Sequence, residues 1–148
     1  MGIRRRSREL AMQALFYMDM RKNDSQEIVE FFCNNFIHSK NVLPFFLKLV
    51  NGVIHTRPEI DSIIERFSSN WKMSRMSCVD RNIIRIAVYE LLFCSDIPSK
   101  VSMNEAIDIG KKFGTEESGA FINGILDSIR IALEKEEINI GVKANKTN

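Results

Sequence analysis

One segment limits the possible folds more than any other. From Val79 to Cys94 the chain is apolar on nearly every side of a helix, and no glycine or proline interrupts it. A helix with such a broad apolar surface must be covered all round, so it belongs at the centre of a helical bundle. Its apolar residues are Ile83, Ile84, Ile86, Ala87, Val88, Leu91 and Leu92. No segment alternates polar and apolar residues for long enough to form a sheet, so we predict an all-α fold.

Apolar residues recur at helical spacing in the rest of the chain as well. Thr56 stands before Arg57 and Pro58, and proline suits the first turn of a helix, so we expect one helix to end there and another to begin. The pattern predicts a compact bundle of about seven helices, which cover approximately residues 4–20, 25–38, 44–55, 58–67, 79–94, 102–113 and 115–133.

The last two predicted helices have the clearest start signals. Ser102 and Glu105 have the spacing of a capping box, which predicts that a helix begins at Ser102 and ends at Gly114. Thr115 is expected to cap the final helix and to place Glu116 and Glu117 near its positive N-terminal end.

The chain has 148 residues, which is a common size for one domain. We expect a single helical domain over residues 1–133, with subdomains of about 1–70 and 77–133. The stretch from Trp71 to Ser77 is the expected connector, because isolated large apolar residues in it could pin the halves together. After Leu133 the apolar pattern dissolves, so residues 134–148 are predicted to form a charged, flexible tail.

Charge and cysteine content exclude several protein classes. The chain has 21 basic and 19 acidic residues, and a net charge of +2 does not by itself indicate a nucleic-acid partner. Cys33, Cys78 and Cys94 are too far apart in sequence to suggest a zinc-binding or redox-active pair. No apolar run approaches the roughly 20 residues that span a membrane, and no targeting segment is evident. A cytoplasmic location is the simplest expectation.

Candidate catalytic groups are weak. His38 and His55 lie near helix ends without a carboxylate or thiol at ligand spacing, which favours surface roles. Scattered carboxylates are interpreted as surface charges and caps, and no glycine-rich phosphate loop is present. We therefore predict no enzyme activity, no cofactor and no metal.

The densest charge feature is an arginine cluster near the N-terminus, at Arg4, Arg5, Arg6 and Arg8. Helical spacing places Gln13 and Phe16 on the same face as Arg5 and Arg8, together with Glu9 and Met12. Guanidinium groups pair with phosphates, an amide can read a base edge, and an aromatic ring can stack on an unpaired base. The pattern is typical of single-stranded RNA recognition. The alternative is a solvated helix end whose Met12 and Phe16 are covered by another helix.

The sequence contains four ordered motifs, at Asp80 to Leu92, Asp96 to Ile107, Lys111 to Thr115 and Phe121 to Asp127. These motifs resemble those of the NusB family. Together with the arginine-rich start and the segment Ala11 to Phe16, the resemblance covers about residues 4–130.

The resemblance implies two three-helix subdomains joined by a connecting helix. It also implies binding to the boxA element of nascent ribosomal RNA, together with the ribosomal protein NusE, and loading onto elongating RNA polymerase with other Nus factors. In the family this assembly suppresses premature termination, and no bond chemistry is involved. Two alternatives stay open: a homodimeric helical scaffold whose interface covers the RNA face, and an RNA-binding accessory module of an RNA-modifying enzyme.

The resemblance assigns roles to two sets of residues. Those implied to bind RNA are Arg4, Arg5, Arg6, Arg8, Gln13, Phe16 and Lys111. Those implied to bind NusE are Asp80, Glu117 and Phe121. Phe16 replaces a tyrosine that is often found there, which keeps stacking but loses a hydroxyl. Glu117 replaces a commoner aspartate, and Ala120 replaces a lysine, which puts one ionic contact in doubt.

Overall fold

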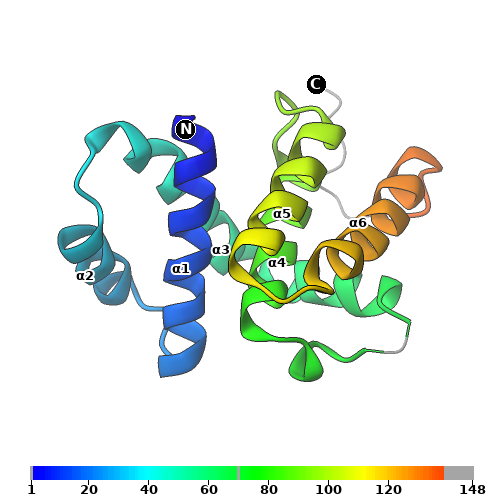
Figure 1. The fold of residues 1–148 in the computed structure, drawn as a ribbon, viewed down its shortest axis with the longest axis horizontal. Helices are drawn as coiled ribbons and strands as arrows, with labels where there is room; N and C mark the ends of the chain where they lie inside the picture. The colour runs from blue at the N-terminus through cyan, green and yellow to red at the C-terminus, as the bar shows by residue number, and fades with distance from the viewer. Residues whose placement is uncertain (1, 70, 139–148) are drawn as a thin grey trace.

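The structure, a computed structural model, describes residues 2–69 and 71–138. Within them the chain forms six α-helices, two short 3-10 helices and no strand, which confirms the all-α class. The helices are α1 (Ile3–Arg21), α2 (Gln26–Phe36), η1 (Lys40–Val42), α3 (Leu43–Phe67), η2 (Met73–Arg75), α4 (Cys78–Phe93), α5 (Ser99–Phe113) and α6 (Ser118–Glu134). Figure 1 shows α1 and α2 on one side of α4, with α6 on the other.

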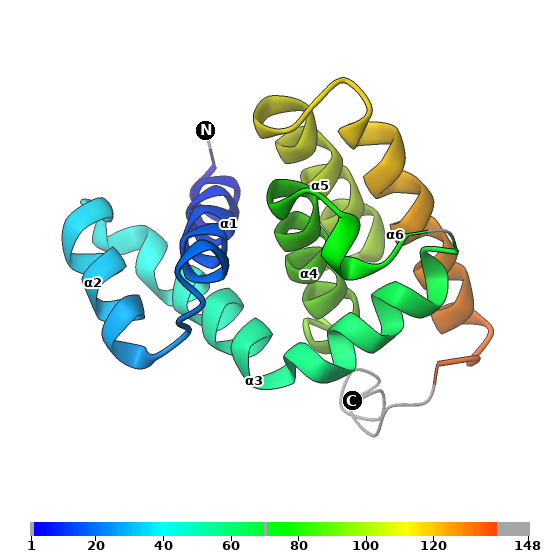
Figure 2. The ribbon, with the colours of Figure 1, turned by 90° about the horizontal axis from the view of Figure 1, so that it is seen from below.

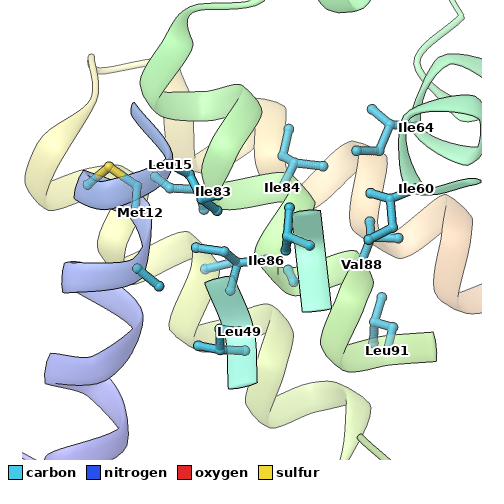
Figure 3. Packing of buried hydrophobic residues seen from close by; sticks show 14 of the residues in the cluster. Met12, Leu15, Leu49, Ile60, Ile64, Ile83, Ile84, Ile86, Val88 and Leu91 are labelled. Atoms are coloured by element: carbon cyan, nitrogen blue, oxygen red, sulfur yellow. The ribbon is translucent and has the colours of Figure 1, made fainter. Parts of the chain in front are cut away.

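The segment that most limited the possible folds is the central helix α4, as predicted. Ile84 and Val88 are fully buried, and Leu91 is nearly so. Figure 3 shows these side chains packed among apolar side chains of α1 and α3. Burying one such side chain contributes about 1.5–3 kcal/mol. One hydrophobic cluster includes residues of all six α-helices, so the predicted subdomains, about 1–70 and 77–133, share a core.

The described residues form six α-helices where about seven were expected, because the break predicted at Thr56 is a kink within one long helix, α3. Thr56 has non-helical backbone angles (φ −113°, ψ 16°) and kinks α3 without ending it. Pro58 lacks a backbone N–H, and the Thr56 hydroxyl donates to the carbonyl of Gly52 at 2.7 Å across the kink. Figure 2 shows the bent α3 running from the side of α1 and α2 to the side of α6. It therefore connects the two halves.

The helix starts predicted at Ser102 and Thr115 are also wrong. α5 begins three residues earlier, directly behind Pro98, and α6 begins at Ser118. The Ser102 hydroxyl donates to Glu90 at 2.7 Å instead of capping its own helix. At the other helix, the Ser118 hydroxyl accepts the backbone N–H of Thr115 at 2.9 Å. Ser102 therefore bonds to a residue of α4 instead of capping α5, and Thr115 lies in the turn before α6 instead of capping it.

The ends of the predicted domain differ in how they pack. Met73 and Met76 are buried in the connector 71–77, where apolar pins were expected. Ile138 is 2% exposed and belongs to the core, so the predicted tail starts later than residue 134. Residues 139–148 of that tail lie outside the described residues. In the described part of the chain, no helix is long and apolar enough to cross a membrane.

Candidate functional site

The arginine cluster lies on the first turns of α1, beside α5. Both helices begin at the same end of the molecule (Figure 1). Arg4 pairs with Asp96, just before α5, at 3.3 Å, and the guanidinium of Arg4 lowers the pKa of this aspartate. Arg5 pairs with Glu105 on α5. The N-terminal edge of α1 is therefore fixed to α5 by ion pairs.

Arg8 is not available to a phosphate, contrary to its predicted role. Its side chain is 4% exposed and donates to both carboxylate oxygens of Glu90, at 2.8 and 2.9 Å. It also donates to Glu105 at 2.9 Å. Burial alone would lower the pKa of Arg8, but the two carboxylates outweigh burial and raise it. Arg8 is thus a buried structural cation that joins α1 to α4 and α5.

Arg5 is intermediate between a structural and a surface residue. It makes two hydrogen bonds to Glu105 and a third to Asp108, the last at 2.9 Å. The guanidinium of Arg5 lowers the pKa of Glu105. Part of the Arg5 side chain is open to solvent, and it lines a groove of about 530 Å³ with Arg4 and Val101. This groove is open to a ligand that approaches α1 and α5 from their common end.

Arg4 and Arg6 are the most open of the four arginines. Both side chains are about half exposed. The Arg4 guanidinium lies 4.9 Å from the ring centre of Phe45, which supports it from below. Arg6 donates to Glu9 at 3.2 Å. These two guanidinium groups are the ones of the cluster that solvent, and therefore a phosphate, reaches most easily.

The lysine that approaches α1 is Lys112 and not Lys111. The Lys112 ammonium donates to Glu9 at 3.1 Å. Lys111 points to α6, because a Cβ added at Gly119 would lie only 3.2 Å from its Cε. Residues 111 and 112 are adjacent in sequence but about 100° apart around the helix, so they serve different neighbours. The predicted RNA role of Lys111 therefore fits Lys112 better.

The basic edge continues along α1 toward the predicted reading and stacking residues. Gln13 and Phe16 follow Glu9 by one and two helical turns, and both are partly exposed. Met12 is buried, which agrees with the alternative that another helix covers this residue. We use the name basic edge for the exposed cations of the first turn of α1 together with the exposed residues that follow along α1 and α5: Arg4, Arg5, Arg6, Lys112, Gln13 and Phe16.

The three predicted partner residues meet in a second place. Asp80, Glu117 and Phe121 line a cleft of about 340 Å³ between the start of α4, the start of α6 and the connector. We call it the aromatic cleft. The rings of Phe121 and Trp71 are perpendicular, with centres 6.1 Å apart, and Trp71 is 50% exposed. An exposed tryptophan beside a second ring is the kind of anchor found in protein interfaces.

Asp80 has an unsatisfied acceptor in this cleft. Its backbone N–H donates to Ser77, which caps α4, at 3.0 Å. Its carboxylate oxygen Oδ1 is buried and has no hydrogen-bond partner within the described residues. Leaving a buried acceptor unpaired costs about 1–3 kcal/mol, so a donor supplied by a bound partner would recover that free energy.

Sequence reasoning missed three residues of these surfaces: Lys112, Trp71 and Arg75. Trp71 could have been found, because it is the one tryptophan and stands in a connector rather than in an apolar helix face. Lys112 could not, because spacing alone does not say which neighbour a helix meets. Among the described residues, no group of histidines, cysteines and carboxylates is arranged to hold a metal ion.

The fold and the two surfaces define a small all-α protein that presents a basic helix edge beside an aromatic cleft. The NusB family model matches residues 5–130, and this span includes both surfaces. The chain belongs to the NusB family.

Relatives from several bacteria match nearly the whole chain. The chain is 59% identical to the transcription antitermination protein NusB of Desulfatibacillum aliphaticivorans over 137 residues, which cover 93% of the chain and 96% of the relative. It is 45% identical to the protein of that name from Myxococcus xanthus over 139 residues, which cover 91% of the chain and 99% of the relative.

Solved structures show the same fold. NusB of T. maritima superposes with a TM-score of 0.77 at 39% identity and covers 91% of this chain and 97% of its own. A second structure contains the antitermination factors NusB and NusE in complex with double-stranded RNA. It superposes with a TM-score of 0.79 at 30% identity and covers 89% of this chain and 98% of its own.

Proposed function

We propose that the chain is a transcription antitermination factor that binds RNA along the basic edge and a NusE-type protein in the aromatic cleft. The observation that carries the proposal is the basic edge itself, in which exposed cations at the start of α1 are followed along the helix by the partly exposed Gln13 and Phe16. Membership of the NusB family and the relative that forms a complex with NusE and RNA support it.

The side chains of the basic edge divide the work of RNA recognition. Arg4, Arg5, Arg6 and Lys112 bind phosphates, Gln13 contacts a base edge, and Phe16 stacks on a base. Arg8 does not touch RNA but holds α1 in place through Glu90. Lys111, on the side toward α6, extends the positive field from the basic edge to the aromatic cleft.

The NusE-type partner occupies the cleft through two kinds of contact. An apolar side chain of the partner inserts beside Trp71 and Phe121, and a cationic or N–H donor reaches the unsatisfied Oδ1 of Asp80. Glu117 lies on the rim, where its Oε2 accepts from the Thr115 hydroxyl at 3.1 Å. Because the α5–α6 turn joins both surfaces, one RNA strand can contact the chain and its partner together.

The proposal also covers the RNA element that is bound and the larger complex that is formed. The RNA is a boxA-type element of nascent ribosomal transcripts, and the complex loads onto elongating RNA polymerase with other Nus factors in the bacterial cytoplasm. The chain acts by binding and is not an enzyme. A homodimer through the RNA face would block this activity, so the oligomeric state is measured alongside binding.

The test is binding of a labelled single-stranded boxA RNA across a salt series, with and without NusE. A duplex of the same sequence is included, because the relative's structure holds double-stranded RNA. The variant Arg4→Ala plus Arg6→Ala should bind at least about tenfold more weakly, and its salt slope should fall by about 1.4, or 0.7 for each lost phosphate contact.

The matched control is Arg66→Ala plus Lys135→Ala, which removes the same charge from the far ends of α3 and α6. It should bind like the native chain. Equal weakening in both variants would mean that net charge alone governs binding. No binding by the native chain with NusE present would refute the proposed function.

A further inference from the structure

All four arginines of the N-terminal cluster are held by carboxylates of the chain itself. Arg4 pairs with Asp96, Arg6 with Glu9, and Arg8 with Glu90. Arg5 is shared between two acids on α5. A surface that is to receive RNA phosphates is therefore already neutralised in the free protein, and phosphate must compete with these acids for the same N–H groups.

The carboxylates that pair with these arginines differ in their burial and in the number of their hydrogen bonds. Glu105 is 19% exposed and binds both Arg5 and Arg8, so it belongs to the buried network. Asp108 is 52% exposed and has a single hydrogen bond to Arg5, at 2.9 Å. Asp96 is similarly exposed and meets Arg4 at 3.3 Å. Solvent reaches these two carboxylates, and so can a ligand.

We propose that Asp108 and Asp96 are exchangeable counter-charges, which occupy Arg5 and Arg4 in the RNA-free protein and give way to RNA phosphates. The inference rests on the proposed function, and it adds residues that set affinity and selectivity. Asp108 lies one helical turn beyond Glu105, so when it leaves, Arg5 keeps its two bonds to Glu105 and stays oriented.

The exchange has a physical reason. An exposed ion pair contributes little to stability, so a phosphate displaces it easily, whereas a displaced carboxylate that stays near the phosphate repels it. One phosphate gains little by replacing one carboxylate. A strand that presents successive phosphates replaces both acids at once and adds the contacts to Arg6 and Lys112. The acids therefore suppress binding of small anions more than binding of an extended strand.

The first experiment measures RNA affinity of Asp108→Asn and Asp96→Asn with labelled single-stranded boxA RNA. Each variant should bind about three- to fivefold more tightly than the native chain, as expected for the loss of one exposed competing ion pair. Weaker binding by either variant would mean that the carboxylate orients its arginine for RNA, and the proposal would be wrong.

The matched control is Asp127→Asn on α6. Asp127 is an exposed aspartate that also pairs with an arginine, Arg130, at 2.8 Å, so the substitution changes net charge equally. Because α4 and α5 lie between α6 and α1 (Figure 1), its effect on RNA affinity should stay within about 1.5-fold. If Asp127→Asn and Asp108→Asn increased RNA affinity equally, net charge alone would explain the gain and the proposed exchange would be wrong.

A double-mutant cycle tests whether the gain passes through Arg5. In an Arg5→Ala background, Asp108→Asn should no longer tighten binding, because the group for which carboxylate and phosphate compete is gone. A gain that persists without Arg5 would contradict the exchange.

A readout without RNA separates this inference from the proposed function. Linear polyphosphate is titrated while the Nε–Hε resonances of Arg4 and Arg5 are followed by NMR. Both resonances should move with polyphosphate, at a lower concentration in Asp108→Asn than in the native chain, and move little with inorganic phosphate. If RNA fails to bind but polyphosphate shifts both resonances, the proposed function fails and the exchange stands. If polyphosphate at saturation leaves them unmoved, the exchange is refuted.

Discussion

The guanidinium of Arg8 on α1 lies against the carboxylate of Glu90 on α4, with two N–O distances of 2.8 and 2.9 Å, and water reaches almost none of either side chain. Ser102 and Glu105 complete the network from α5. A residue from the arginine-rich start of the chain is thus part of the core. Substitution of Arg8 should therefore lower the stability of the fold, and it should change RNA affinity only through that loss of stability.

Arg8→Ala should lower the free energy of unfolding by about 3–5 kcal/mol, because it leaves the carboxylate of Glu90 buried without its cation. Urea unfolding measures this change. Arg8→Met combined with Glu90→Met should recover much of the loss, since it removes both charges. Under conditions where Arg8→Ala stays folded, its RNA salt slope should equal that of the native chain. A salt slope that is shallower by about 0.7, the value for one phosphate contact, would show that Arg8 binds RNA directly.

Asp19 should make stability depend on pH in the acid range. Burial would raise its pKa, but Asn82, Arg85 and Arg57 outweigh burial and hold the pKa at about 2 instead of 3.8. Between these values the unfolded chain binds more protons than the folded one, so stability falls as pH falls. The stability difference between the native chain and Asp19→Asn should be full above about pH 4 and shrink toward pH 2. Urea unfolding at pH 5 and pH 2.5 checks it. A constant difference would show that folding does not lower the pKa of Asp19.

Gly52 should be sensitive to substitution, because a Cβ at this position would lie 2.2 Å from Cζ of Tyr89. Gly52→Ala should therefore destabilise the protein by about 1–3 kcal/mol through overpacking between α3 and α4. Gly124→Ala is the control, since nothing lies within 4 Å of its added Cβ. That variant should be neutral or more stable by up to about 1 kcal/mol, because alanine favours helix. Thermal unfolding compares the two, and equal effects would rule out the close approach as the cause.

The aromatic cleft should control partner affinity separately from RNA affinity. Phe121→Ala and Trp71→Ala should each weaken NusE binding by about tenfold or more, as expected for aromatic anchors. Asp80→Asn should also weaken NusE binding, because it removes the negative charge of the carboxylate whose Oδ1 is proposed to accept a hydrogen bond from NusE. Calorimetry with NusE measures the three variants, and RNA binding by the chain alone serves as control. Unchanged NusE affinity in all three would place the partner elsewhere.

The two adjacent lysines of α5 should differ in their effect on RNA. Lys112→Gln should reduce the salt slope by about 0.7 and weaken binding, because Lys112 belongs to the basic edge. Lys111→Gln removes the same charge but from the side facing α6, so its effect should be smaller. A larger effect of Lys111→Gln would restore the role that the family resemblance implied for it.

Much of the fold could be predicted from local patterns. Apolar spacing located the helices to within a few residues, and the nearly all-round apolar segment 79–94 identified α4 as central. The locations of the helices follow from the helical period of 3.6 residues and not from composition, because the spacing of apolar residues is a local property of each helix. The arginine cluster and the Phe16 position could likewise be found in the sequence, since each is a local feature.

Other outcomes depended on which residues meet across long sequence separations. Glu90 captures Arg8 and Ser102, so one predicted RNA ligand becomes buried and one predicted helix cap disappears. Helical spacing cannot tell whether a polar side chain faces water or a partner that lies far away in the chain. The sequence by itself determined the helices, the central α4 and the basic start of α1. Only the tertiary structure decided which charges are buried and which stay exposed, because a buried charge needs a counter-charge and the partner of Arg8, Glu90, lies 82 residues away in the chain.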